Sequence, residues 1–221
     1  VALACLAETA KVLAADAENL ALWKEILPPS LELLERMYRR LGIEFTCTLG
    51  ESFYHDRLQT VVNSLRSAGI AEESDGATVV FVEGYDTPMI VQKRDGAFLY
   101  ATTDLATIQY RMDEWKPQAM LYVVDHRQSL HFEQLFAVSR RWGYSHVELK
   151  HVEFGTILGE DGRPFKTRTG ASVGLGEVLD EAVAHARKVV AENDHENQIS
   201  DAERDDIAEK VGLGAIKYAD L

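Results

Sequence analysis

A tyrosine and an aspartate lie four positions apart where a strand-like stretch gives way to a helix-like one. In "GAFLYATTDLAT" (96–107), Tyr100 is expected to end the strand and Asp104 to lie in the first turn of the helix. Thr102 or Thr103 is the natural N-cap between them. The helix dipole favours a carboxylate in the first turn by about 0.3–1 kcal/mol. The spacing alone fits equally well a first-turn helix acid beside a core tyrosine at the edge of a sheet.

A second polar turn, "DHRQSLH" (125–131), follows the apolar run "AMLYVVD". Its Gln128 offers both a hydrogen-bond donor and an acceptor, and Ser129 is the expected cap of the next helix. A carboxylate, a phenol and an amide that converge on one crevice suit a planar cation with several donors. Guanidinium is such a cation, and a carboxylate binds it bidentately.

Strands and helices that alternate along the chain must position these side chains. The strand-like runs are "ATVVFVEG" (77–84), "PMIVQKRDGAFLY" (88–100), "AMLYVVD" (119–125) and "VELKHVEFG" (147–155). The second run is expected to fold back at Asp95-Gly96. The helix-like runs are "TTDLATIQYRMDEW" and "SLHFEQLFAVSRRWG". This alternation predicts an α/β fold with a parallel sheet flanked by helices, in which ligands bind beyond the carboxyl ends of the strands.

The rest of the chain is expected to be mainly helical. Helices are predicted at 1–23, 31–41, 55–69, 175–192 and 200–211, with a short strand at 43–49. "PPS" should separate the first two, Ser30 should cap the second, and Gly42 should end it. We expect three regions: helical residues 1–75, sheet-bearing residues 76–172 and helical residues 173–221. A chain that starts at Val1 within a helical pattern is expected to be a fragment.

Composition indicates a soluble cytoplasmic protein without a membrane partner. The net charge of −13 argues against a general nucleic-acid-binding surface, although a local basic patch is compatible with it. Cys5 and Cys47 lie far apart without metal-type spacing, as in a reduced cytosolic chain. A metal site of His126, His131 and Glu133 is the weaker alternative, because no further histidine or cysteine completes it. We expect no metal site.

Five segments in order resemble arginyl-tRNA synthetases, a class I family, from about residue 15 to the last residue. They are "GESFYHDRL", "YATTDLAT", "QSLHFEQLF", "HVEFGTILGEDGRPFKTRTG" and "GAIKYADL". The resemblance implies a Rossmann-like (HUP-type) catalytic domain with a mainly helical insertion at its start. It also implies arginine–tRNA ligase activity in the full-length enzyme, with arginine, ATP and tRNA(Arg) as substrates. Mg²⁺ is expected with the ATP, and no organic cofactor.

The resemblance also implies roles for individual residues. The guanidinium group would be held by Tyr100, Asp104 and Gln128, and ATP would be contacted by His131, Gly155 and Leu158. "GEDGRPFKTRTG" resembles the mobile K-M-S-K-S loop, which stabilises charge on the leaving pyrophosphate. Pro164 and Thr167 replace the two lysines of that motif. The implied catalytic residues are therefore Lys166, Thr167 and Arg168.

The sequence lacks one motif of a complete class I synthetase, and two other functions are alternatives to the ligase. The H-x-G-H motif of class I synthetases is absent from the 221 residues, so the resemblance implies the second half of the catalytic domain, inactive alone. A dinucleotide-binding enzyme is disfavoured, because the G-x-G of "GLGEVL" follows no strand and lacks a third glycine. A non-catalytic binding module with a synthetase-like fold is the other alternative. An upstream H-x-G-H would favour the enzyme.

Overall fold

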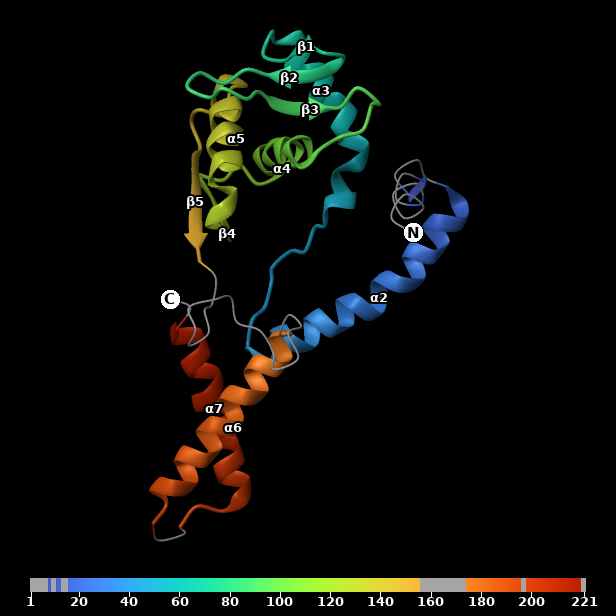
Figure 1. The fold of residues 1–221 in the computed structure, drawn as a ribbon. Coiled ribbons are helices and arrows are strands. Elements are labelled where there is room, and N and C mark those ends of the chain that lie inside the picture. Colours follow the sequence, from blue (N-terminus) through green and yellow to red (C-terminus); the bar gives the residue numbers. More distant parts are fainter. Residues whose placement is uncertain (1–7, 9–10, 13–15, 156–173, 196–197, 220–221) are drawn as a thin grey trace. The chain divides into compact units, whose positions relative to one another are not determined.

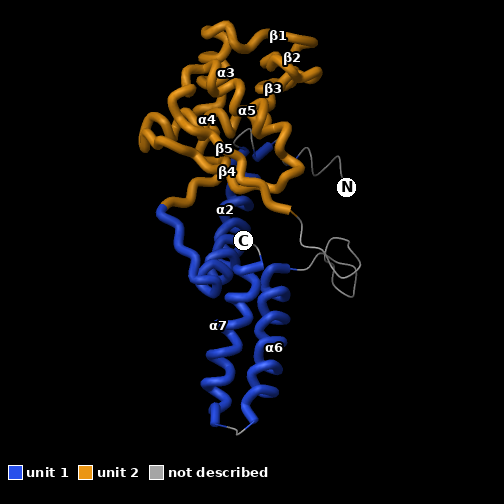
Figure 2. Tube along the Cα trace, turned by 90° about the vertical axis from the view of Figure 1, so that its left-hand side faces the viewer, with its two compact units in different colours: residues 1–46, 165–221 blue, residues 47–164 orange. Residues whose placement is uncertain are grey.

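The chain forms two compact units. The computed structural model describes residues 8, 11–12, 16–155, 174–195 and 198–219. Unit 1 comprises Val1–Thr46 and Phe165–Leu221, and unit 2 comprises Cys47–Pro164 (Figure 2). These boundaries differ from the predicted ones at 75/76 and 172/173. The predicted division separates regions by their role in a synthetase, whereas the two units are separated by how compactly they pack. The predicted division therefore stays a prediction.

Unit 2 holds every strand that the structure describes (Figure 1). Its elements in chain order are η1 (Glu51–Arg57), α3 (Leu58–Ser67), β1 (Glu72–Ser74), β2 (Ala77–Val80), β3 (Met89–Gln92), α4 (Tyr100–Glu114), β4 (Ala119–Asp125), η2 (His126–Gln128), α5 (Ser129–Arg141) and β5 (Glu148–Phe154). Strands β1, β2 and β3 form an antiparallel sheet in that order, and β4 pairs with β5.

The predicted parallel pairing is confirmed for β4 and β5. They run in parallel register from Ala119↔Glu148 to Asp125↔Phe154, and α5 lies between them in the chain. On one face Tyr122 is buried, and its ring lies 5.2 Å from Phe132 and 5.5 Å from Phe136 of α5. The carboxyl ends of both strands therefore lie at the edge where α5 begins.

One apolar core joins the helices of unit 2 to both of its sheets. Its fully buried members include Val61, Val62, Leu65, Val80, Val91, Leu105, Ile108, Leu135 and Val138. Because α4 contributes buried residues through Ile108, its amino-terminal half is fixed by packing.

The predicted boundary between strand and helix near Tyr100 is wrong. Helix α4 begins at Tyr100, and the extended Leu99 is its N-cap. Thr102 does not cap the helix, because its side chain is buried and its hydroxyl donates to the carbonyl of Val91. The segment before the helix pairs with β3 only through the bridge between Gln92 and Phe98. The predicted turn is confirmed by Gly96, at φ +84°.

Helix α2 (Ala17–Arg40) continues through Pro28 and Pro29, so the predicted break at "PPS" is wrong. Proline's φ of about −65° is close to the helical value, and the helical path continues although two N–H donors are lost. Ser30 does not cap a second helix, because its hydroxyl lies 3.4 Å from the carbonyl of Ile26. Gly42 ends α2 as predicted, at φ +62°.

The predicted strand at 43–49 is also wrong, because the structure assigns no strand there. A strand needs a partner for its backbone N–H and C=O groups, and within the described ranges no strand pairs with this segment. The predicted helix at 55–69 is confirmed in its main part by α3, which η1 precedes.

In unit 1, α2 is joined by ion pairs to α6 (Leu175–Asn193) and α7 (Asp201–Ala219). Arg40 of α2 donates to Asp180 of α6 at 2.6 Å and to Glu209 of α7 at 2.8 Å. Both predicted helices are confirmed, although α7 extends beyond the expected end at 211. Buried Gly212 marks the close approach of α7 to α6, because an added Cβ would lie 2.8 Å from the Val183 backbone.

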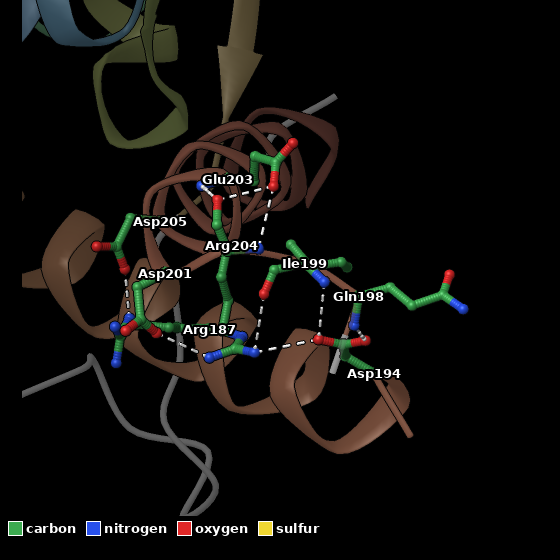
Figure 3. Close-up of polar contacts among 9 residues, drawn as sticks. Arg187, Asp194, Gln198, Ile199, Asp201, Glu203, Arg204 and Asp205 are labelled. Carbon is green, nitrogen blue, oxygen red and sulfur yellow. Dashed lines mark hydrogen bonds and ion pairs between the residues drawn. The ribbon is translucent and has the colours of Figure 1, made fainter. Parts of the chain in front are cut away.

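A polar cluster fixes the turn between α6 and α7 (Figure 3). The buried carboxylate of Asp194 accepts hydrogen bonds from the backbone N–H groups of Gln198 at 2.9 Å and Ile199 at 3.2 Å. Arg204 donates to the same carboxylate at 3.1 Å (Figure 3). Burial acts to raise the pKa of Asp194, but these three hydrogen bonds together outweigh it and hold that pKa below its ordinary value.

Candidate functional site

Polar side chains gather where β4 and β5 end and where α4 and α5 begin. Tyr100 and Asp104 come from the start of α4, whereas Gln128 and His131 lie at the start of α5. His151 lies in the middle of β5, and Glu153 lies one residue before its end. The carboxyl edge of a parallel pair is where α/β proteins bind ligands.

Tyr100 and Asp104 lie on the same face of α4. Residues i and i+4 of a helix are neighbours on its surface, so the start of α4 at Tyr100 brings the phenol within one turn of the carboxylate. Tyr100 is 72% exposed, and the Asp104 side chain is 31% exposed. Both predicted positions are wrong: Tyr100 is the first residue of α4 and not a strand end, and Asp104 lies beyond the first turn of α4, which holds no acidic residue.

Asp104 is hydrogen-bonded to His131, which joins α4 to α5 at the site. His131 Nε2 lies 2.7 Å from Asp104 Oδ2, and the His131 side chain is 25% exposed. The His131 ring packs edge-on against Phe132, with centroids 5.1 Å apart at 73°. The two residues lie 27 positions apart in the chain. The pairing of Asp104 with His131 therefore could not be predicted from their spacing in the sequence.

Gln128 lies on the surface just before the same helix turn. It is the N-cap residue of α5, with φ −97° and ψ 8°, and its side chain makes no cap hydrogen bond. Among the residues that the structure describes, no hydrogen bond joins Gln128 to Tyr100 or Asp104. The structure therefore pairs Asp104 with His131 and leaves Gln128 exposed.

Ser129, predicted as a cap, is instead the first residue of α5. Its hydroxyl lies 2.7 Å from Glu153 Oε1 of β5. Glu153 is a site residue that sequence reasoning missed, and so is His151, two positions earlier on the strand. The available signal was the alternation of His151 and Glu153 with apolar residues toward the carboxyl end of the strand.

His151 is nearly enclosed, with 8% of its side chain exposed. Its Nε2 lies 2.8 Å from the Val124 carbonyl, and its ring packs on Phe132 at 4.6 Å between centroids. Its Nδ1 is buried without a hydrogen-bond partner in the described part of the chain, 3.6 Å from Glu153 Oε1. Because a carbonyl oxygen only accepts hydrogen bonds, His151 donates to Val124 through its Nε2–H.

Two ionisable groups next to the site have displaced pKa values. The guanidinium of Arg127 binds the Asp125 carboxylate at 2.8 Å through both Nε and Nη2 and holds its pKa far below the usual range. Burial raises the pKa of Tyr122 to about 12, so its hydroxyl stays protonated at neutral pH. Arg127 thus neutralises Asp125, whereas no lysine or arginine in the described part of the chain forms an ion pair with Asp104.

The three residues of the alternative metal site have other partners. His126 Nδ1 lies 3.6 Å from Asp125, His131 binds Asp104, and Glu133 accepts a hydrogen bond from the Tyr85 hydroxyl at 2.8 Å. In the described ranges, no three or more His, Cys, Asp or Glu side chains gather in a way that could hold a metal ion.

The predicted phosphate loop lies outside the described residues. It includes Lys166, Thr167 and Arg168, and the predicted ATP contact Leu158 lies outside as well. Gly155 is described, and it is exposed directly after β5.

A parallel strand pair with a helical crossover and polar groups at its carboxyl edge is characteristic of α/β domains of the Rossmann-like class. The chain belongs to the family described as tRNA synthetases class I (R), catalytic domain, whose model matches residues 7–221. The class I arginyl-tRNA synthetase resemblance is thereby confirmed at the level of the family.

Curated relatives and a solved structure agree with this family. The chain is 55% identical over 222 residues to the arginine–tRNA ligase of Rhodopirellula baltica, covering 99% of this chain and 33% of the relative. It is 47% identical to that of Frankia casuarinae, covering 94% of this chain and 37% of the relative. The arginyl-tRNA synthetase of Plasmodium falciparum matches with a TM-score of 0.82 at 26% identity, over 96% of this chain and 36% of that chain. The chain thus spans about a third of the length of these relatives.

Within the described ranges, no helix has both the length and the apolar character needed to cross a membrane.

Proposed function

We propose that the full-length protein activates arginine with ATP to arginyl-adenylate and transfers arginine to tRNA(Arg) in the cytoplasm. The observation that carries this proposal is a partly buried Asp104, one helical turn from an exposed Tyr100, in a chain of this family. The relatives named above are arginine–tRNA ligases, which does not favour a non-catalytic binding module.

Asp104 is the proposed charge partner of the arginine side chain. A guanidinium group presents several donors in a planar fork, and a carboxylate binds two of them at once. The exposed phenol of Tyr100 and the amide of Gln128 would fix the plane of that fork. Lysine carries a compact ammonium instead of a fork, so the same pocket should bind it poorly.

The ATP side of the reaction is proposed for the residues that follow. His131, Gly155 and Leu158 would contact ATP, and Lys166, Thr167 and Arg168 would stabilise charge on the departing pyrophosphate. Mg²⁺ would enter with the ATP phosphates, and the reaction needs no organic cofactor.

The proposed division of labour places a helical connecting region in residues 1–75. The second half of the catalytic domain would occupy residues 76–172, and a helical segment toward an anticodon-binding domain residues 173–221. Because no H-x-G-H occurs in the 221 residues, we expect this chain by itself to be inactive in arginine activation.

The proposal is tested by Asp104→Asn in the full-length protein, with KM values for arginine and ATP measured by aminoacylation of tRNA(Arg). Removing one partner of a desolvated charge pair costs about 2–5 kcal/mol. Since 31% of the Asp104 side chain is exposed, the lower end applies. The arginine KM should therefore rise about thirtyfold, with the ATP KM nearly unchanged.

Asp113→Asn is the matched control, because Asp113 lies on the same helix and is exposed. It should leave both KM values close to wild type. Equal increases in the two KM values for Asp104→Asn would contradict the guanidinium-binding role.

A further inference from the structure

We propose that His131 is a positioning residue that holds the carboxylate of Asp104 in the orientation needed to bind a guanidinium group. This inference rests on the proposed function and gives His131 a role on the arginine side of the site. The carrying observation is the distance of 2.7 Å between His131 Nε2 and Asp104 Oδ2.

The chemistry of the pair fixes which atom donates. An ionised carboxylate only accepts hydrogen bonds, so His131 must donate through its Nε2–H. Hydrogen bonds to an ionised acceptor are shorter and stronger than neutral ones, and 2.7 Å lies at the short end of that range. Free rotation of the Asp104 carboxylate is thereby restricted.

The contact leaves Asp104 able to bind a cation. The hydrogen bond from His131 reaches Oδ2 and leaves Oδ1 without a contact to His131. Each carboxylate oxygen has two lone pairs, so Oδ2 also keeps one acceptor position. A bidentate guanidinium contact therefore remains possible.

Both partners are mounted on packed elements. Asp104 is followed in α4 by Leu105 and Ala106, which are fully buried. His131 precedes buried Phe132, whose ring packs against both Tyr122 and His151. Both helices are packed into the same core of unit 2. The Asp104 carboxylate is therefore positioned by two packed helices and not by a loop.

The test uses His131→Ala, His131→Gln, Asp104→Asn and the double variant Asp104→Asn/His131→Ala in the full-length protein. Arginine affinity is measured by calorimetry, and KM values for arginine and ATP by aminoacylation of tRNA(Arg). His131→Ala should raise the arginine Kd and KM about three- to thirtyfold, and more than it raises the ATP KM. His131→Gln supplies another N–H donor and should recover most of the arginine affinity.

The double variant separates positioning from an independent contact. If His131 acts through Asp104, the double variant should bind arginine no more weakly than Asp104→Asn alone. His126→Ala, at a nearby exposed histidine, is the matched control and should leave the arginine KM unchanged.

Three results would overturn the positioning role: an ATP KM that rises while the arginine KM does not, no recovery by His131→Gln, or additive effects in the double variant. If Asp104→Asn weakens arginine binding and His131→Ala does not, only this inference fails. If Asp104→Asn itself leaves arginine binding unchanged, the guanidinium-binding proposal fails, and the positioning role is refuted with it.

Discussion

Replacing Gly212 of α7 by alanine should destabilise the α6–α7 pair, whereas replacing Gly214 by alanine should stabilise it. The two glycines lie two positions apart in the same helix, but only Gly212 is buried. A Cβ on Gly212 would lie 2.8 Å from both Cα and N of Val183 and 2.9 Å from the carbonyl carbon of Ala182. A Cβ on Gly214 would meet nothing within 4 Å.

The expected magnitudes follow from these distances. Alanine in place of glycine favours a helix interior by about 0.5–1 kcal/mol. At Gly214 this gain should appear in full, because no atom opposes the added methyl group. At Gly212 the methyl group meets backbone atoms, which no side-chain rotation can relieve, and overpacking costs about 1–3 kcal/mol. We expect a net loss of up to about 2.5 kcal/mol there and a difference of about 1–3 kcal/mol between the two variants, because both share the gain in helix propensity.

Hydrogen exchange of the α6 and α7 amides in the full-length protein measures this local stability, because the amides of a helix pair exchange through local opening. Gly212→Ala should speed their exchange and Gly214→Ala should slow it. If both variants changed exchange in the same direction and by similar amounts, helix propensity would dominate. The inferred close approach of α7 to α6 at Gly212 would then be refuted.

Two further predictions concern charged side chains. The lowered pKa of Asp194 means that its stabilising contribution is complete above its ordinary value of 3.8 and is lost as the pH falls from there through the lower folded-state pKa. Asp194→Asn should therefore speed exchange in the α6–α7 turn at pH 7 and make it less sensitive to acid, and an unchanged acid response would contradict this. Lys166→Ala in the full-length protein should slow arginyl-adenylate formation about tenfold or more, with arginine binding nearly unchanged. ATP–pyrophosphate exchange in the presence of tRNA checks this, and a wild-type exchange rate would exclude Lys166 from phosphate handling.

Local signals predicted the elements around the site well. The apolar run at 119–125 became β4, and the apolar spacing of 129–143 became α5 with Gly143 just beyond its end. Gly42, Gly69 and Gly143 all follow helices with positive φ, which is the conformation that glycine adopts without steric cost. These features depend on residues close together in the chain, and so they can be recognised from sequence.

Apart from the break expected at the prolines of α2, the wrong predictions depended on partners distant in sequence or on a competing role for a side chain. Thr102 is a good N-cap by residue type, yet its hydroxyl binds the Val91 carbonyl and the side chain is buried in the core. Ser129 was also expected to cap, but its hydroxyl lies against Glu153 of β5. In both cases a tertiary contact prevailed over a local preference, and that contact is invisible without the fold.

The displaced start of α4 changes the physical basis of the candidate site. A phenol at a strand end and a carboxylate in a following helix would be joined by a flexible turn, so their separation would vary. With both on one helical face, their separation is set by the helix itself, and Cβ atoms at i and i+4 lie about 5–6 Å apart. Asp104 then gains its second constraint from His131 on α5. Residue types could be predicted from the sequence, but the rigidity that selective binding of a planar cation requires arises only from how α4 and α5 pack.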